Sequence, residues 1–218
     1  MLLKIYSALG SYIYSCRKDA LCVNMLIGSQ LKTDEYTASL KEHTLFVDSH
    51  GQKMELRIRI PEYAQDFALT QSGHPLSFAT ENGYAVLRGV WNEAQPILIT
   101  FTPALRRVCA HPLAEADRGL VCVMYGPYVM CAESLDNDGR VDFTIAQSPA
   151  LSLEGDEVTG QTADGHTFRL IPYYRWCNRN TDSHAARMAV WFPQEAMPDS
   201  DTLTKAMAGR LYANYDLL

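Results

Sequence analysis

The spacing of apolar residues changes from helical to strand-like near residue 20. Four apolar residues recur at intervals of three and four positions: Leu2, Ile5, Leu9 and Ile13. This spacing predicts a short amphipathic helix over residues 2–14. No Ser, Thr, Asp or Asn precedes it as an N-cap, and so short a helix is marginal without a surface to pack against. We therefore expect residues 1–18 to be a residual helix of a larger helical body.

From Leu21 onward the apolar residues follow a period of two, beginning with Leu21, Val23, Met25 and Ile27. The segment from Met54 to Ile60 is apolar on one face and charged on the other, as in a half-solvated antiparallel strand. It ends at Pro61, which has no N–H to donate to a ladder. Further strands are predicted at residues 44–47, 84–88, 96–102, 119–125, 128–132, 141–145, 167–171 and 187–192.

Many short strands with little helix predict an all-β fold of two antiparallel β-sandwich (jelly-roll-like) domains. We interpret the more polar stretch 104–119 as the joint between them. The first sandwich is then expected at 19–108 and the second at 109–197. Helical spacing returns at Leu203, Met207, Leu211 and Tyr215, which predicts a C-terminal helical tail within 198–218, with Ser200 or Asp201 as its N-cap.

Composition narrows the class of protein. The chain has 218 residues, 47% hydrophobic and 20% charged, with a net charge of -6. This balance is typical of a globular protein with a sizeable core. No cluster of Lys and Arg provides a surface for phosphates, so we expect no nucleic-acid partner. No apolar run approaches the ~20 residues that a membrane helix needs, so we expect no membrane partner either.

The six cysteines include no CxxC pair. Their even number permits disulfides, but most lie within apolar, strand-like runs, where cysteine behaves as a small hydrophobe. We therefore expect free thiols, which are typical of a cytoplasmic protein. We expect no signal peptide in the first residues, because polar residues interrupt the apolar run and no small-residue cleavage pattern follows.

Several local strings occur in an order and spacing that together resemble glycoside hydrolase family 127, whose characterised members include β-L-arabinofuranosidases. The strings are LGSYIYS at 9–15, LCVNMLIGS at 21–29, LRIRIPEYA at 56–64, YGPYVMCAE at 125–133, LIPYYRWCNR at 170–179 and MAVWFP at 188–193. Residues 83–91 add a further match. The chain departs from the family pattern at Tyr63, where the family usually has tryptophan, and at 92–95, where it usually has Gly-Asp.

The resemblance implies an (α/α)-barrel catalytic domain followed by β-sandwich domains. The family's chemistry uses a cysteine nucleophile bound to zinc, with further cysteine and glutamate ligands; zinc keeps such a thiolate deprotonated near neutral pH. That nucleophile lies in a Cys-Cys-Pro motif upstream of the helix that residues 3–14 match. This sequence contains no Cys-Cys pair. We therefore assign no catalytic, cofactor-binding or metal-binding residue, and expect no cofactor in this chain.

Five side chains are candidate carbohydrate or interface contacts: Tyr173, Tyr174, Trp176, Arg179 and Trp191. The flat aromatic rings suit the apolar face of a sugar, but packing in a core or interface is the commoner role of such rings. Strand alternation would place Tyr173 opposite Tyr174. Arg179 could reach into a neighbouring site, although an exposed loop arginine is the default.

Cys131 and Glu133 are two residues apart in a predicted strand and so share a face. A thiol beside a carboxylate could form a reactive site. A packed cysteine near a surface glutamate is the more common arrangement, and it is the one that we expect.

Two functions remain. The first is a non-catalytic C-terminal fragment of a β-L-arabinofuranosidase-like glycoside hydrolase that supports or completes a helical barrel absent from this chain. Its partner would be a helical-barrel chain that buries the apolar face of residues 2–14. The alternative is a stand-alone module that binds arabinose-containing oligosaccharides or forms a homodimer.

Overall fold

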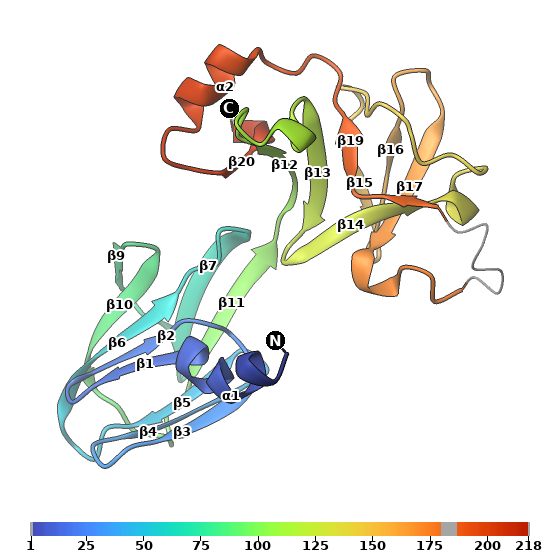
Figure 1. Ribbon diagram of the computed structural model, residues 1–218. Helices are drawn as coiled ribbons and strands as arrows, with labels where there is room; N and C mark the ends of the chain where they lie inside the picture. Colours follow the sequence, from blue (N-terminus) through green and yellow to red (C-terminus); the bar gives the residue numbers. More distant parts are fainter. Residues whose placement is uncertain (1, 180–186, 218) are drawn as a thin grey trace. The chain divides into compact units, whose positions relative to one another are not determined.

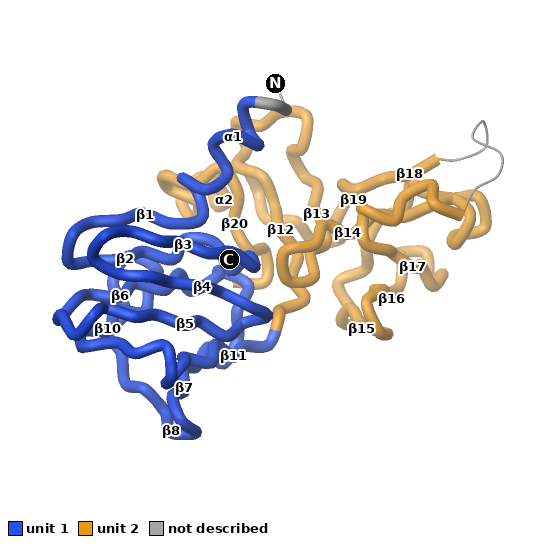
Figure 2. The backbone as a smooth tube through the Cα atoms, turned by 90° about the horizontal axis from the view of Figure 1, so that it is seen from below, with its two compact units in different colours: residues 1–102 blue, residues 103–218 orange. Residues whose placement is uncertain are grey.

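The computed structural model describes residues 2–179 and 187–217, and the chain divides into two compact units (Figure 2). Unit 1 spans residues 1–102 and unit 2 spans residues 103–218. Both units are built from strands, most of them paired antiparallel, so the predicted all-β fold class is confirmed. The predicted boundary between residues 108 and 109 falls within a strand of unit 2, Leu105–Ala110.

Unit 1 contains two sheets (Figure 1). The five-stranded sheet has the order β1 (Tyr14–Arg17), β2 (Ala20–Val23), β6 (Lys53–Arg59), β10 (Tyr84–Val90), β9 (Ala79–Glu81). The six-stranded sheet has the order β3 (Ser29–Lys32), β4 (Thr37–Lys41), β5 (Thr44–Asp48), β11 (Ile97–Pro103), β7 (Ala64–Gln71), β8 (His74–Pro75). Buried side chains from both sheets form one hydrophobic core, which makes unit 1 a β-sandwich.

The alternation in the sequence correctly identifies the inner face of β6. Met54, Leu56 and Ile58 are buried, and the residues between them are more exposed. In β2 the pattern holds only for Leu21 and Val23 because the strand ends there. The predicted continuation through Met25 and Ile27 is wrong, since both side chains are exposed.

One strand pair in unit 1 differs from the expected antiparallel arrangement. Strands β2 and β6 are parallel, with Leu21 opposite Leu56 and Val23 opposite Ile58. Between them the chain passes through β3, β4 and β5 of the other sheet. A connection of this length allows parallel pairing, whereas a tight hairpin would not.

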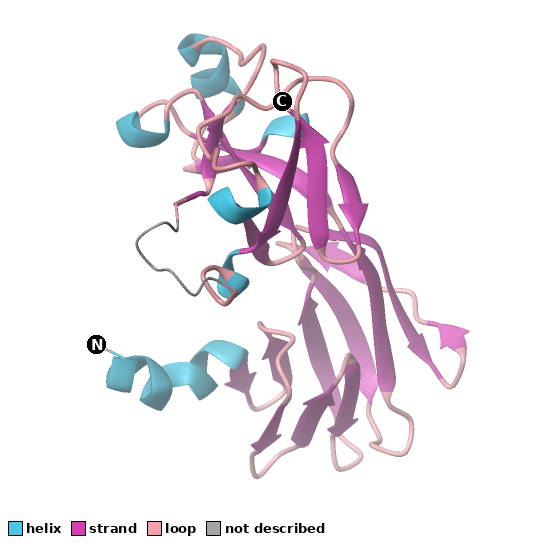
Figure 3. Ribbon diagram, turned by 90° about the vertical axis from the view of Figure 1, so that its right-hand side faces the viewer, coloured by secondary structure: helices cyan, strands magenta, loops and turns pink. Residues whose placement is uncertain are grey.

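Helix α1 (Leu2–Ile13) forms where the apolar spacing predicts it. Figure 3 shows it projecting beyond the strands of unit 1. Ile13, at its C-terminal end, is buried in the sandwich core. Four large apolar or aromatic side chains nearer its start are exposed: Ile5 (52%), Tyr6 (74%), Leu9 (36%) and Tyr12 (58%).

Unit 2 is one hydrogen-bonded series of strands, and Figure 1 shows it bending between β13 and β14. Its order is β15 (Ser152–Glu154), β16 (Glu157–Gln161), β17 (Thr167–Pro172), β14 (Tyr128–Glu133), β13 (Leu120–Tyr125), β12 (Leu105–Ala110), β20 (Tyr212–Asn214). Strands β13 and β14 pair only beside their turn, at Met124–Val129 and Tyr125–Tyr128. Where they diverge, β18 (Met188–Ala189) pairs with β14 and β19 (Trp191–Pro193) pairs with β13.

The core of unit 2 lies between the two halves of this bent sheet. It combines Val121 and Val123 of β13 with Phe168 and Leu170 of β17. Phe143 lies against Phe168, with ring centres 4.9 Å apart and planes at 22°. The predicted strand at 141–145 is wrong, because only Ile145 forms bridges, to Thr162 and Gln194. Its alternating apolar residues reflect core burial rather than a ladder.

The C-terminal tail is helical over a shorter range than predicted. Helix α2 spans Ser200–Ala206, and its N-cap is Asp199, whose carboxylate accepts a hydrogen bond from the Thr202 N–H. Gly209 follows with a φ of 76°, a conformation that commonly ends helices. The chain then enters β20 and pairs with β12. Leu203 and Met207 are buried as helical spacing predicts, but Leu211 is exposed.

Across the part of the chain that the structure describes, none of the helices has the length and apolar character needed to span a membrane.

Candidate functional site

Three of the five side chains singled out in the sequence lie together at the end of β17. Pro172 is the last residue of that strand, and the chain turns directly into a 3-10 helix, η3 (Tyr173–Arg175). The N–H of Trp176 donates to the carbonyl of Tyr173 at 3.0 Å. Tyr173, Tyr174 and Trp176 are all partly exposed, with no buried residue in η3.

The 3-10 turn decides which of these rings meet. Side chains three residues apart eclipse one another in a 3-10 helix. Accordingly, the rings of Tyr173 and Trp176 are 6.3 Å apart and nearly parallel, at 11°. Strand alternation does not apply to these residues, because the strand ends at Pro172. Tyr173 and Tyr174 nevertheless have different ring neighbours, Trp176 and Tyr128.

A fourth aromatic residue, Tyr128, was not singled out in the sequence. Its ring lies 5.4 Å from that of Tyr174, at 58°. Strand β14 pairs with β17 through Met130–Pro172 and Cys131–Ile171, which brings the start of β14 beside the end of β17. The sequence gives no signal for this strand pair. We call Tyr128, Tyr173, Tyr174 and Trp176 the aromatic cluster; their exposed fractions are 45%, 46%, 60% and 39%.

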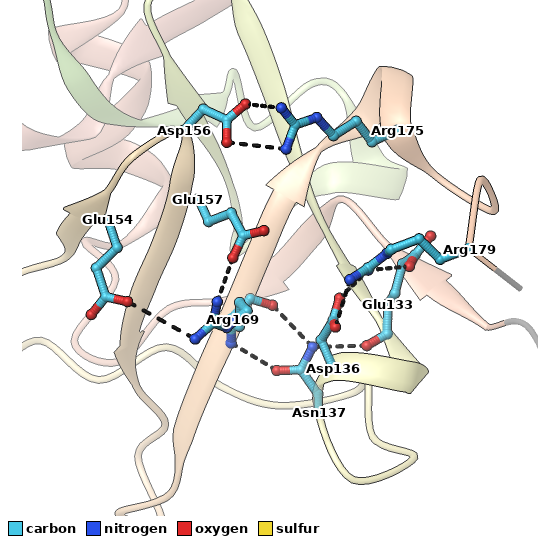
Figure 4. A network of polar contacts seen from close by, with 9 residues as sticks. All are labelled: Glu133, Asp136, Asn137, Glu154, Asp156, Glu157, Arg169, Arg175 and Arg179. Carbon is cyan, nitrogen blue, oxygen red and sulfur yellow. Dashed lines mark hydrogen bonds and ion pairs between the residues drawn. The ribbon is translucent and has the colours of Figure 1, made fainter.

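Arg175 borders the aromatic cluster. Its guanidinium forms a two-point contact with the carboxylate of Asp156, one bond being Nη1 to Oδ1 at 3.1 Å (Figure 4). Its guanidinium carbon also lies 5.8 Å from the centre of the Tyr174 ring. Both members of the ion pair remain partly exposed. The edge of the aromatic cluster therefore presents planar polar groups to solvent.

Glu133 anchors the segment that follows the aromatic cluster. One carboxylate oxygen accepts the backbone N–H of Cys177 at 2.6 Å, and the other accepts Arg179 Nη2 at 2.7 Å (Figure 4). The Glu133 side chain is 6% exposed and that of Arg179 is 44% exposed. The expected surface position of Glu133 is therefore wrong, whereas Cys131 is buried as expected.

Arg179 is held by two carboxylates instead of extending freely from a loop. Besides Glu133, it donates Nη1 to Asp136 Oδ1 at 3.0 Å, and Nη2 contacts the other oxygen of Asp136. Hydrogen bonds with Asp136 and then Glu133 raise the pKa of Arg179. The positive charge of Arg179 is therefore neutralised by carboxylates of the same unit.

Asn137 completes the support, and sequence reasoning missed it within a polar turn. It is buried, and its amide nitrogen donates to the carbonyls of Glu133 at 2.8 Å and Arg169 at 2.9 Å. Its amide oxygen accepts the Arg169 N–H at 2.8 Å. These bonds connect the end of β14 to β17 (Figure 4).

The remaining candidate, Trp191, makes its ring contact elsewhere. It lies in β19 beside β13, and its ring lies 6.1 Å from Tyr212 of β20 at 26°. It is only partly exposed. The structure thus places Trp191 in the packing of the other half of the sheet.

The cysteines of the chain are free thiols, as expected. Burial raises the pKa of Cys122 to about 12 and that of Cys131 to about 11, with Glu133 adding to the effect at Cys131. These thiols stay protonated near neutral pH, which makes them poor nucleophiles. Within residues 2–179 and 187–217, no three His, Cys, Asp or Glu side chains come together in a group that could hold a metal ion. These residues therefore do not fit the zinc centre that the family resemblance implies.

Unit 2 is thus a bent all-β unit that carries an exposed aromatic cluster. Residues 105–193 match the family model of the glycoside hydrolase family 127 C-terminal domain. The resemblance of this chain to the C-terminal portion of family 127 is thereby confirmed, and the matched residues lie in unit 2.

Known proteins resemble the chain over most of its length. The non-reducing end β-L-arabinofuranosidase of Bifidobacterium longum subsp. longum is 25% identical over 179 residues, which is 66% of this chain and 26% of that protein. A GH127 β-L-arabinofuranosidase from Geobacillus stearothermophilus T6 is 25% identical with a TM-score of 0.71, covering 89% of this chain and 36% of that one. A GH127 β-arabinofuranosidase at 22% identity and a TM-score of 0.64 shares the fold over 86% of this chain and 37% of that one. The chain thus spans about a quarter of the curated relative and little more than a third of the solved structures.

Proposed function

We propose that this chain is the non-catalytic C-terminal portion of a β-L-arabinofuranosidase-like glycoside hydrolase. In this role its β-domains support or complete a catalytic helical barrel that lies outside these 218 residues. The partial coverage of the relatives supports this proposal, because they contain much sequence that this chain does not match.

The exposed apolar face of α1 carries the proposal. Ile5, Leu9 and Tyr12 follow the three- and four-residue spacing of one helix face, and all three side chains are exposed. Burying a large apolar side chain is worth about 1.5–3 kcal/mol. A face of this kind is therefore stabilised by a partner, and the ridges of a neighbouring helix match it well. A helical barrel would supply such a neighbour.

The state of the cysteines also supports a non-catalytic role. A nucleophilic cysteine needs a thiolate, and nearby cations or a metal usually provide for it. Cys109, Cys122 and Cys131 are buried, and burial raises the pKa of each. These three thiols are therefore poorly suited to act as nucleophiles, which supports a catalytic centre in the barrel.

The test is complex formation with a helical barrel encoded beside this chain and containing a Cys-Cys-Pro motif. Size-exclusion chromatography with light scattering should show the two co-eluting at one to one. The double substitution Ile5→Glu and Leu9→Glu should abolish co-elution, because two charges would be buried without partners. The matched control is Leu113→Glu, an apolar residue that is 83% exposed in unit 2 and should not affect binding.

Two results would count against the proposal: a coding region without any such barrel, or a barrel that elutes separately from this chain. The isolated chain should elute as a monomer of 24.4 kDa. If it instead forms a homodimer that Leu9→Glu dissociates, the stand-alone dimerisation module is the better description.

A further inference from the structure

We propose that the aromatic cluster of unit 2 binds a neutral sugar chain. This binding site is separate from the support of a helical barrel and needs only unit 2. Three features of unit 2 favour such binding: the rings are exposed, the charges beside them are paired, and hydrogen bonds hold the segment that carries them.

The exposure of the four aromatic rings indicates a binding surface. Tyr128, Tyr173, Tyr174 and Trp176 are each between 39% and 60% exposed, and their rings contact one another in two pairs, Tyr173 with Trp176 and Tyr128 with Tyr174. Aromatic side chains bury large areas when they can, and a contiguous exposed group of them commonly marks a binding surface. The nearly parallel rings of Tyr173 and Trp176 offer flat apolar faces, which suit the C–H face of a sugar ring.

The charges next to the cluster favour a neutral ligand. Arg175 is paired with Asp156, and Arg179 is paired with both Glu133 and Asp136. Figure 4 shows five carboxylates around three guanidinium groups in this region. An anionic ligand would meet a surplus of negative charge, whereas sugar hydroxyls can bond to the exposed edges of Arg175 and Asp156.

A protein partner fits this surface less well. The cores of protein interfaces are depleted in charged residues other than arginine, and a stable interface covers about 800 Å² on each partner. Here the Arg175–Asp156 ion pair lies at the edge of the aromatic cluster, with Arg175 5.8 Å from the centre of the Tyr174 ring. A sugar ring has an apolar C–H face beside polar hydroxyl groups. These would match the aromatic rings and the neighbouring ion pair, respectively.

The segment that carries the rings is held in place before any ligand arrives. Buried Glu133 fixes the Cys177 N–H and Arg179, and buried Asn137 joins the end of β14 to Arg169 within β17. Sugars bind weakly, so a surface that must order itself on binding would lose much of the available affinity. Glu133 and Asn137 therefore act as positioning residues for the aromatic cluster.

The experiment is an NMR and calorimetric titration of the full chain with a neutral arabinose trisaccharide, and with a galacturonic acid trisaccharide as an anionic comparator of the same size. We expect saturable binding of the neutral sugar with a Kd of roughly 1 mM. Trp176→Ala and Tyr173→Ala should each raise the Kd at least tenfold, whereas Trp176→Phe should retain most of the binding. Tyr6→Ala is the matched control, since Tyr6 is an exposed aromatic on α1.

Thermal unfolding of each variant shows whether it folds. If Trp176→Ala does not fold, Tyr173→Ala and Trp176→Phe still test the proposal. Three outcomes would overturn the proposal: no saturation by roughly 50 mM sugar, unchanged affinity in the Trp176 and Tyr173 variants, or preference for the galacturonic acid. The titration uses the chain alone, so failure here leaves the proposed support of a barrel unaffected.

Discussion

Glu133 shows how one buried charge organises the candidate site. Its two oxygens are used by the Cys177 N–H and by Arg179, so the chain after η3 is tied to β14. Removing one member of a fully buried ion pair costs about 3–5 kcal/mol because the other charge is left uncompensated. Arg179 is 44% exposed and keeps Asp136, which reduces this cost.

We therefore predict that Glu133→Gln lowers the free energy of unfolding by about 2 kcal/mol. The glutamine keeps an acceptor for the Cys177 N–H but loses the charge that faces Arg179. Urea denaturation measures the change. The matched control is Arg140→Gln, which breaks an exposed pair with Asp164 and should cost less than about 1 kcal/mol. Equal losses in the two variants would contradict the role given to Glu133.

Asp164 gives a prediction for the dependence of stability on pH. Hydrogen bonds from the Thr162 hydroxyl and then from Arg140 lower the pKa of this carboxyl to about 2. A carboxyl with a lowered pKa in the folded state stabilises the protein above its unfolded pKa, and that contribution is lost as the pH falls towards 2. The wild-type protein should thus lose stability more steeply than Asp164→Asn between about pH 4 and pH 2.

Urea midpoints measured at several pH values would check this prediction. The difference between wild type and Asp164→Asn should be largest near neutral pH and should close near pH 2. Arg140→Gln should shift the transition to higher pH, since one of the bonds that lower the Asp164 pKa is removed. Parallel pH profiles for wild type and Asp164→Asn would contradict the assignment.

For single residues, the sequence predicts which side chains share one face of a strand. It does not predict which of them are buried by other strands. It correctly placed Cys131 and Glu133 on one face. It did not identify Glu133 as buried, because burial there depends on β17 and β18, which both pair with β14 from distant parts of the chain. Arg179, which neutralises Glu133, lies 46 residues further along the chain.

Among the elements, strand β16 carries a tight packing constraint at Gly160. A Cβ atom at this position would lie 2.5 Å from Cζ of Phe168 and 2.8 Å from Cδ2 of Leu151. Phe168 cannot easily move, since it is 2% exposed and its ring packs against that of Phe143. The glycine therefore allows β16 to approach the aromatic core of unit 2.

We predict that Gly160→Ala destabilises the chain by about 1–3 kcal/mol through overpacking. Thermal or urea unfolding measures this effect. The matched control is Gly10→Ala in α1, where the added methyl group has no neighbour within 4 Å and should not destabilise. An unchanged midpoint for Gly160→Ala would show that the core near Phe168 is looser than described.

The elements that were predicted well are those with a local signal. Helix α1 and strand β6 follow the spacing of their own apolar residues. The ends of elements were predicted less well, because turns override the spacing. The 3-10 turn after Pro172 regrouped the aromatic rings, and Gly209 ended the predicted helix that began near Ser200.

For the whole molecule, we distinguish the β units of this chain from the catalytic barrel proposed to carry out the reaction. The two β units and the match of residues 105–193 to the family 127 C-terminal domain are findings, whereas the helical barrel and its chemistry are proposed to lie outside this chain. The strongest sequence evidence for the resemblance to family 127 was the order of several short matching strings. The periodicity of apolar residues alone does not indicate a family. The parallel pairing of β2 with β6 could not be predicted, since the chain between them forms three strands of the other sheet.

The most direct test of the central claim is turnover of an aryl β-L-arabinofuranoside by the purified 218-residue chain, with and without added zinc. The account predicts release of the aryl group at the rate of buffer alone in both conditions, because the buried cysteines stay protonated and the described residues hold no metal-binding group. Turnover that rises in proportion to the protein concentration, and that disappears when one of its cysteines is replaced by serine, would contradict it.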